Sequence, residues 1–381
     1  MMTESQNIAL KTSIRTRLPA VDAMRGSVMV FMTLDHASYA FNAGRYAVDS
    51  AIWYRPGSEI PAAQFLTRWV THLCAPTFIF LAGLVLALSV ARRQARGDLE
   101  HTIDGDIFKR GIFILLLDPL WMSFGFGGNI TFQVLYAIGA SFCLMVLFRR
   151  LGMVKLLLIG IGLLLFGEAL ARLTLWPGDG QKLGAIGVML ITGLQRVKTI
   201  FVLYPLLPWL AFMILGWACG KYMLKRDAFN PVRFFSAAGA ASLIVFFIAR
   251  GFNKYGNMLL YRYDNSLLQW LHVSKYPPSL TFSALELGLM FLILAFLFAW
   301  YRNRDASPIN PVQVFGRTPL FFYVIHVHLL AAASWLLDRH QTGGLFEAYL
   351  ATVAALLVLY PLCSWYGHLK QAHPNSLLRY L

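Results

Sequence analysis

Residues 72–91 read HLCAPTFIFLAGLVLALSVA and contain no acidic residue and no Lys or Arg. A helix needs roughly 20 mostly apolar residues to cross the hydrocarbon core of a bilayer, because its backbone must satisfy its own hydrogen bonds there. This stretch has the required length and composition. It therefore predicts a membrane-spanning helix.

Stretches of the same kind recur along the 381 residues of the chain. Apolar and aromatic residues make up 58% of the composition and charged residues only 13%, against about a quarter in soluble proteins. These values exclude a soluble enzyme, a disordered tail and a secreted disulfide module. We predict an all-α, polytopic integral membrane protein with about ten transmembrane helices. They are placed at residues 20–41, 72–91, 108–125, 131–148, 154–176, 201–220, 234–252, 279–301, 318–337 and 346–366.

Basic residues set the predicted orientation. With a cytoplasmic N-terminus, the inner segments hold about twice as many Lys and Arg as the outer segments, which is the bias that marks the cytoplasmic side. Both termini are therefore expected in the cytoplasm, as a segment at 1–19 and a tail at 367–381, with a membrane domain at 20–366. The apolar run after residue 19 lacks a small-residue cleavage site, which indicates an uncleaved first span.

The net charge of +15 is explained by this topology, and no nucleic-acid partner is expected, since no basic patch with interleaved aromatic residues occurs. The four cysteines stand singly in apolar stretches, so neither a disulfide framework nor a zinc site is indicated, and no metal is expected. The motifs of ATP hydrolysis, dinucleotide binding, zinc proteolysis and the serine nucleophile elbow do not occur.

The predicted loops and glycines add two expectations. Three predicted outer loops are longer than helix packing requires, which indicates function: they are residues 42–71, 177–200 and 253–278. Small residues inside spans permit close helix approach, and those with this predicted role are Gly83, Gly139, Gly216 and Gly220. No internal repeat is evident, which disfavours the inverted-repeat transporters.

The first predicted helix carries a polar stripe. Successive residues of a helix are 100° apart around its axis, and this spacing places six residues on one face: Asp22, Arg25, Gly26, Met29, Thr33 and His36. The stripe predicts either a cavity lining or, alternatively, an Asp22–Arg25 ion pair with His36 bonded to a neighbouring helix. Asp35 points about 100° away from His36, so a supporting role beneath the site is as consistent as a catalytic dyad.

Other polar residues in or beside the spans need a partner or a task, because burying them is costly. His72 is expected near the outer surface, where it either converges with His36 or is a surface histidine at a helix start. Asp118 and Glu286 are the costliest to bury, and Glu168 is a further buried acid. The residues assigned to substrate binding or structure are Arg68, Asp118, Gln133, Glu286, Lys275, Tyr323, His326 and His328.

Five sequence blocks carry a family resemblance. They are DAMRG at 22–26 followed by Met32 and Asp35-His36, HLCAPTFIFLAG at 72–83, YPLLPWLAFMILGWACG at 204–220, SKYPPSL at 274–280 and GRTPLFFYVIHVHLL at 316–330. In this order they resemble the catalytic-domain family of the heparan-α-glucosaminide N-acetyltransferases and its bacterial relatives. The resemblance implies a polytopic acetyltransferase of the bacterial inner membrane. Such an enzyme takes acetyl-CoA from the cytoplasm and acetylates an amino sugar or glycan on the other side; whether it forms a homodimer is left open.

The resemblance carries the D-x-x-R-G block over to Asp22, Arg25 and Gly26. His36 stands where the lysosomal relatives have an asparagine, and their outer-loop histidine has no counterpart between residues 37 and 71. The catalytic imidazole is therefore expected to be His36 or His72.

The chemistry suits a histidine, because an acetyl thioester is already activated and one proton must leave the acceptor. We predict His36 as general base, or as an acetyl-carrying nucleophile, with Asp35 or His72 assisting. The residues predicted to bind CoA are Asp22, Arg25, Arg92, Arg93, Arg149 and Arg150. Topology alone also explains the last four. Two alternatives stay open: a transporter of an amino sugar or glycan precursor, and an O-acyltransferase of an envelope polysaccharide.

Overall fold

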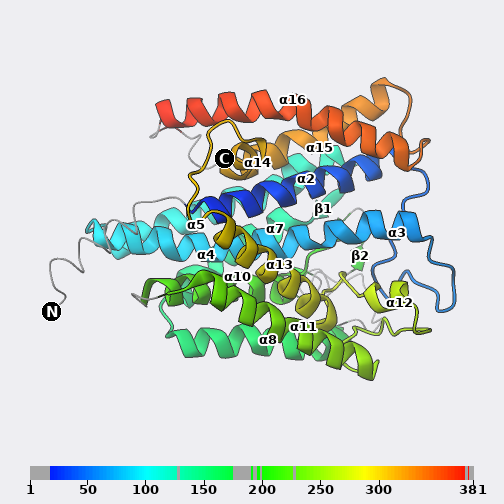
Figure 1. The fold of residues 1–381 in the computed structure, drawn as a ribbon, viewed down its shortest axis with the longest axis horizontal. Helices are drawn as coiled ribbons and strands as arrows, with labels where there is room; N and C mark the ends of the chain where they lie inside the picture. The colour runs from blue at the N-terminus through cyan, green and yellow to red at the C-terminus, as the bar shows by residue number, and fades with distance from the viewer. Residues whose placement is uncertain are drawn as a thin grey trace.

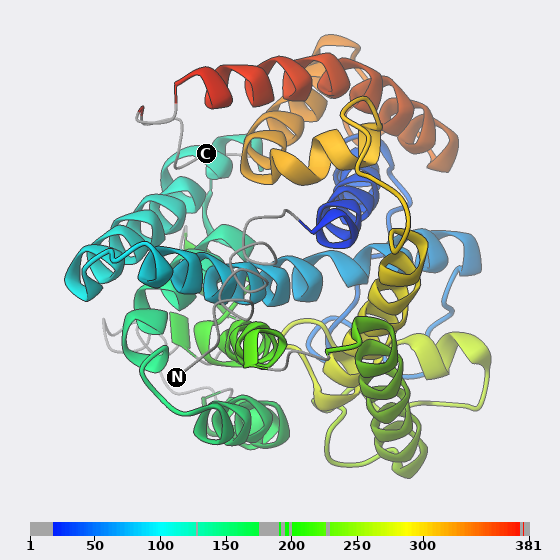
Figure 2. The ribbon, with the colours of Figure 1, turned by 60° about the vertical axis from the view of Figure 1, so that its left-hand side comes forward.

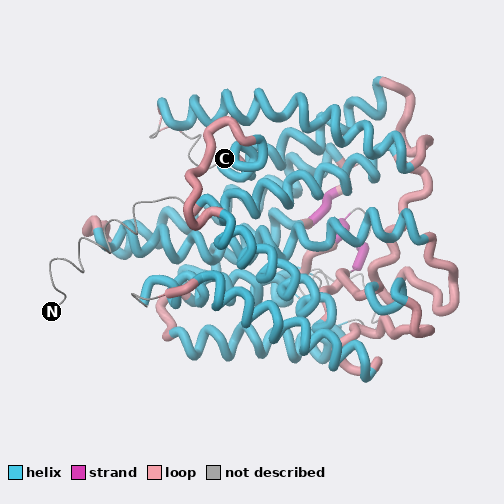
Figure 3. The backbone as a smooth tube through the Cα atoms, viewed as in Figure 1, coloured by secondary structure: helices cyan, strands magenta, loops and turns pink. Residues whose placement is uncertain are grey.

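A computed structural model describes residues 18–126, 129–174, 190–191, 195–197, 200–225, 229–373 and 376, so most of the predicted outer loop at 177–200 lies outside the described residues. The chain is mostly helical, at 74%. Long helices run side by side around α2 (Figure 1, Figure 3). The helices are α2 (Pro19–Phe41), α3 (Ala62–Trp69), α4 (Cys74–Ala95), α5 (Glu100–Leu117), α6 (Ser123–Gly125), α7 (Val134–Phe148), α8 (Met153–Thr174), α10 (Leu206–Lys225), α11 (Pro231–Phe252), α12 (Leu267–Leu271), α13 (Leu280–Trp300), α14 (Pro311–Arg317), α15 (Pro319–Leu336) and α16 (Leu345–Ala372).

Among the described residues, seven helical segments are long and apolar enough to cross a membrane. They are Ala62–Ala95, Met153–Arg172, Leu206–Lys225, Pro231–Phe252, Leu280–Trp300, Pro319–Leu336 and Leu345–Ala372. Helix α7 is apolar but shorter, and α2 carries Asp22, Arg25 and Asp35. The chain is therefore a multi-pass membrane protein. The number of ten spans and the orientation stay predictions.

The structure departs from the predicted second and third spans. The second helix begins at Ala62, directly after Pro61, and reaches α4 through a 3₁₀ turn, Val70–Leu73. His72 therefore lies inside the protein, fully buried, and not at the surface. The third predicted span begins earlier, at Glu100, and contains a π-helical segment, Asp118–Met122. Pro119 lies in that segment and has no backbone N–H to donate.

A small sheet interrupts the all-α prediction. Strands β1 (Ile130–Phe132), β2 (Gln195–Val197) and β3 (Ile200–Val202) lie in the order β1-β3-β2. β1 is parallel to β3, with Ile130 opposite Ile200, and β2 is antiparallel to β3. The predicted spans at 131–148 and 201–220 are thus wrong at their first residues, where apolar residues form strands.

Glycines bring helices into backbone contact. A Cβ on Gly83 would lie 2.1 Å from the carbonyl oxygen of Met213, and one on Gly216 would lie 2.0 Å from that of Phe80, so α4 and α10 cross closely. Cβ atoms on Gly139 and Gly220 would also meet backbone oxygens, at 2.5 and 2.7 Å. The packing predicted for these four glycines is confirmed.

Gly26 has the same role between α2 and α14. A Cβ there would lie 1.8 Å from the carbonyl oxygen of Val312, and a Cβ on Gly316 would lie 1.8 Å from that of Asp22. The glycine of the D-x-x-R-G block is therefore required by packing, since any side chain would force α14 away from α2.

The bundle has two distinct ends. The first turn of α2 and the last turn of α16 lie at one end, on the left in Figure 1, and α3 and α12 lie at the other (Figure 1, Figure 2). We name these the basic end and the loop end. At the loop end, buried Arg250 donates hydrogen bonds to the carbonyl oxygens of Leu260, Gln269 and His272, at 2.5–2.8 Å, and so organises the loop between α11 and α13.

We expect Gly216→Ala to lower the free energy of unfolding by about 1–3 kcal/mol, because the added methyl cannot fit against α4 without moving a helix. Thermal unfolding in detergent measures the change. Gly162→Ala is the matched control, since nothing lies within 4 Å of a Cβ at that helical position. Equal unfolding temperatures for the two variants would contradict the packing argument.

Candidate functional site

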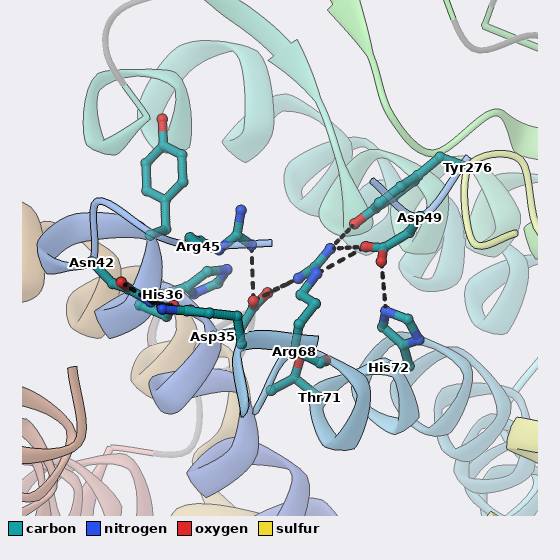
Figure 4. A network of polar contacts seen from close by, with 12 residues as sticks. Asp35, His36, Asn42, Arg45, Asp49, Arg68, Thr71, His72 and Tyr276 are labelled. Atoms are coloured by element: carbon teal, nitrogen blue, oxygen red, sulfur yellow. Dashed lines mark hydrogen bonds and ion pairs between the residues drawn. The ribbon is translucent and has the colours of Figure 1, made fainter. Parts of the chain in front are cut away.

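Arg68 links two buried acids at the loop end. Its Nη1 donates to Asp35 at 2.5 Å, and its Nε donates to Asp49 Oδ2 at 2.9 Å. A third bond, at 3.2 Å, runs from Nη2 to the hydroxyl of Tyr276 (Figure 4). One guanidinium thus joins α2, the loop after it, α3 and the loop before α13. Such a fork can hold several oxygen acceptors at fixed angles.

Asp49 lies in the loop after α2 and is fully buried. Burial alone would raise the pKa of its carboxyl, but Arg68, His72 and Lys275 together lower that pKa well below its ordinary value. Asp49 is therefore ionised at neutral pH. It also lies beside His72, whose Nε2 is 3.3 Å from Asp49 Oδ1.

Asp35 accepts hydrogen bonds from arginines and not from the adjacent histidine. Besides Arg68, the Nη2 of Arg45 donates to Asp35 Oδ1 at 2.9 Å. The side chain of Asp35 stays 14% exposed. Asp35 therefore orients two cations at the site and makes no hydrogen bond with His36 among the described contacts.

His36 instead contacts α15. Its Nδ1 lies 2.7 Å from Nε2 of His326, whose Nδ1 lies 3.0 Å from the carbonyl oxygen of Phe322. The edges of Phe126 and Tyr323 also approach the His36 ring, at centroid distances of 5.4 and 6.1 Å. His36 thus bonds a neighbouring helix, as one of the two sequence interpretations held, while it also lines a cavity.

That cavity, the loop-end cavity, has a volume of about 410 Å³. Aromatic side chains form much of its wall, and Asp35, Arg45 and Arg68 supply charge. Its remaining lining residues are His36, Tyr39, Ala47, Trp53, Phe126, Asn129, Thr131, Gln133, Phe201, Leu203, Tyr204 and Tyr276. The strands β1 and β3 contribute Thr131 and Phe201, so the unpredicted sheet is part of this wall.

Two cavities approach from the basic end. The basic chamber, of about 650 Å³, is lined by several cations: Arg25, Arg92, Arg110, Arg317 and Lys370. It shares Arg25, Arg110, Arg317 and Lys370 with the middle cavity, of about 260 Å³, which extends to Val134 and Tyr323. Tyr323, which lines the middle cavity, contacts His36, which lines the loop-end cavity. Val134 of the middle cavity also follows Gln133 of the loop-end cavity directly in sequence. A thin layer of side chains therefore separates the two cavities.

The stripe on α2 follows this sequence of cavities. Asp22 lines the basic chamber, Arg25 lines both the chamber and the middle cavity, Met29 lines the middle cavity and His36 the loop-end cavity. The predicted cavity lining is confirmed for these residues. The Asp22–Arg25 pair of the alternative interpretation is also present, at 4.0 Å.

The predicted CoA-binding residues separate into two groups. Asp22, Arg25 and Arg92 line the basic chamber. The other three arginines form ion pairs elsewhere: Arg93 with Asp98 and Asp106, Arg149 with Glu100 and Asp104, and Arg150 with Asp104. Sequence reasoning missed Arg110, Arg317 and Lys370, whose only signal was their position among the predicted inner cations.

Four other predicted residues have structural contacts. Asp118 Oδ2 accepts from the backbone N–H groups of Gln133 and Tyr136, at 2.8 and 2.6 Å, and so caps α7. The ring nitrogens of His328 face the carbonyl oxygens of Val324 and Trp121. The backbone N–H of Lys275 donates to the carbonyl oxygen of Asp49 at 2.9 Å, and the Glu168 carboxylate accepts from the backbone N–H groups of Gly256 and Met258.

Glu286 is buried on α13, and its Oε1 has no hydrogen-bond partner among the described residues. No cluster of three or more His, Cys, Asp or Glu side chains within the described ranges is placed to hold a metal ion.

Comparison with known families supplies an independent observation. A family model described as heparan-alpha-glucosaminide N-acetyltransferase, catalytic, matches residues 17–250. The chain belongs to this family. The match covers more than half of the chain and includes DAMRG, Asp35-His36 and the blocks at 72–83 and 204–220. The blocks at 274–280 and 316–330 lie beyond it. No curated protein matches the chain. Membership of this acetyltransferase family indicates a membrane-bound transferase.

We expect Arg68→Met to lower the free energy of unfolding by about 3–5 kcal/mol, because it leaves Asp35 and Asp49 buried without their shared cation. Arg45→Met is the matched control. Arg45 bonds only Asp35 among these acids and its side chain is 18% exposed, so its loss should cost less. Chemical unfolding in detergent compares the two, and a larger loss for Arg45→Met would refute this view of the network.

Proposed function

We propose that this protein transfers an acetyl group from acetyl-CoA to the amino group of an amino sugar or glycan, with His36 as general base. The proposal depends on one observation: the middle cavity and the loop-end cavity lie on opposite sides of one thin layer of side chains, and that layer contains His36. Family membership supports the reaction class. The basic end would face the cytoplasm of a bacterium, with the chain in the inner membrane.

The basic chamber suits the polyphosphate end of CoA. Five cations line it, against the single carboxylate of Asp22. Arginines bind phosphate through paired N–H groups. Arg93, Arg149 and Arg150, which line none of these cavities, form ion pairs with acids instead. Apart from the four cations that it shares with the basic chamber, the middle cavity has a mostly apolar lining, with Met29, Leu135 and Tyr323 in it, which suits a narrow pantetheine arm.

The loop-end cavity suits a sugar. Tyr39, Trp53, Tyr204 and Tyr276 offer faces and edges on which the C–H surface of a sugar ring can pack. Asp35 and the arginines that it orients offer donors and acceptors for hydroxyl groups. These groups support the choice of acceptor class. The acceptor nitrogen would lie beside His36.

The reaction needs little beyond alignment and one base. The thioester supplies an already activated acetyl group. As the acceptor nitrogen bonds to the acetyl carbon, the C–S bond breaks and CoA leaves as a thiolate. His36 removes the proton from the nitrogen and can later return it to the thiolate, so that no net charge accumulates.

Purified protein in liposomes, with radiolabelled acetyl-CoA outside and glucosamine inside, tests the proposal. We expect label on the sugar, and a loss of about 10²–10⁴-fold in turnover for His36→Ala, which removes the base. CoA binding should stay within about tenfold of wild type, since His36 does not line the basic chamber. His340→Ala, outside all three cavities, is the control. Sugar that crosses unmodified, with or without acetyl-CoA, would instead establish a carrier.

The basic chamber has its own test. Arg317→Gln should raise KM for acetyl-CoA by about 10- to 100-fold with little change in kcat, because one charge-assisted phosphate contact is lost. Arg93→Gln is the matched control, since Arg93 pairs with Asp98 and Asp106 and should leave KM unchanged. Steady-state kinetics in detergent measure both. An equal effect of the two substitutions would place the phosphates elsewhere.

A further inference from the structure

The contacts of His326 determine which nitrogen of His36 carries a proton. His326 Nδ1 lies 3.0 Å from the carbonyl oxygen of Phe322, and a carbonyl oxygen only accepts, so this nitrogen must donate. In a neutral His326, Nε2 is then unprotonated and accepts. It lies 2.7 Å from His36 Nδ1, which must therefore carry the proton. The Nε2 of a neutral His36 is left with a lone pair.

The geometry of the two rings supports a direct bond. Their centroids are 4.9 Å apart and their planes differ by only 24°, as expected for two imidazoles joined edge to edge through one nitrogen each. His326 is fully buried. Among the described residues, it is the only hydrogen-bond partner of the His36 ring, since Asp35 is held by Arg45 and Arg68.

We propose that His326 is a positioning residue that holds His36 in the tautomer whose basic Nε2 is available to the acceptor. The inference rests on the proposed function and deepens it. A main-chain carbonyl on α15 fixes the proton of His326, and His326 in turn fixes that of His36. The imidazole of His326 and the carbonyl of Phe322 here take the orienting role that a buried carboxylate takes in many hydrolases.

The same pair accommodates the proton that the reaction releases. When the acceptor nitrogen bonds to the acetyl carbon and the C–S bond breaks, His36 Nε2 takes the proton and becomes an imidazolium. Its Nδ1–H then makes a charge-assisted bond to His326 Nε2, which strengthens as the charge develops. Transfer of the Nε2 proton to the departing thiolate restores both neutral rings.

Three substitutions at one position separate positioning from packing. His326→Gln places a carbonyl oxygen near the position of Nε2, so it can still accept from His36. His326→Asn carries the same amide but is too short to reach, and His326→Leu has no acceptor. We expect His326→Leu and His326→Asn to lower kcat about 10²–10⁴-fold, with KM for both substrates within about threefold of wild type. His326→Gln should keep kcat within about tenfold of wild type.

Ser334→Ala is the control on the same helix, since Ser334 bonds the carbonyl oxygen of Ala331 and the ring of His340 and lines none of the three cavities. It should keep kcat within about threefold of wild type. Thermal unfolding confirms that each variant is folded. The proposal would be overturned if His326→Gln were as inactive as His326→Leu, or if His326→Leu were as active as wild type.

A readout independent of acetyl transfer distinguishes this inference from the proposed function. Diethyl pyrocarbonate acylates an unprotonated imidazole nitrogen, and peptide mass spectrometry gives the rate at His36. We expect the rate to fall about threefold or more in His326→Leu and to stay near wild type in His326→Gln, whether or not acetyl transfer is detected. Equal rates in all variants would refute the positioning role. Unequal rates without acetyl transfer would retain it and reject the acetyltransferase.

Discussion

Charge that lies inside a membrane protein must be paired, and in this protein the pairing of Arg68 holds the loop end together. Its guanidinium bonds Asp35 on α2, Asp49 in the following loop and Tyr276 before α13. Each contact offsets part of the free-energy cost of removing Arg68 and its partner from water. Because His36 follows Asp35 on α2, the same network fixes where the ring of His36 enters the loop-end cavity.

Much of the helical framework could be predicted from the sequence. Uninterrupted apolar runs predict helix positions, because the bilayer requires a spanning helix to have a certain length and hydrophobicity. Pairs such as Gly83 and Gly216 report close crossings because no other residue fits. The stripe on α2 was also readable, since a helical face follows from spacing alone. The strands β1 and β3 were not, because short apolar segments next to an apolar helix have no periodicity of their own.

The site was less predictable, for a physical reason. His36 and His326 are 290 residues apart in sequence, and their bond depends on how α2 packs against α15. Arg317 and Arg149 look alike in the sequence as cations next to helix ends. Only the fold shows that acids surround Arg149, while Arg317 lines a chamber. Residue type predicted the chemistry, whereas tertiary packing decided which members of each type are near one another.

The thin layer between the middle and loop-end cavities has an electrical consequence. Water or charged ligand in a cavity conducts the potential inward, so most of the voltage across an energised membrane falls over the few side chains that remain, His36 and Tyr323 among them. A unit charge that crosses such a layer gains or loses about 2.3 kcal/mol per 100 mV. Proton movement between the two cavities would therefore couple catalysis to the membrane potential.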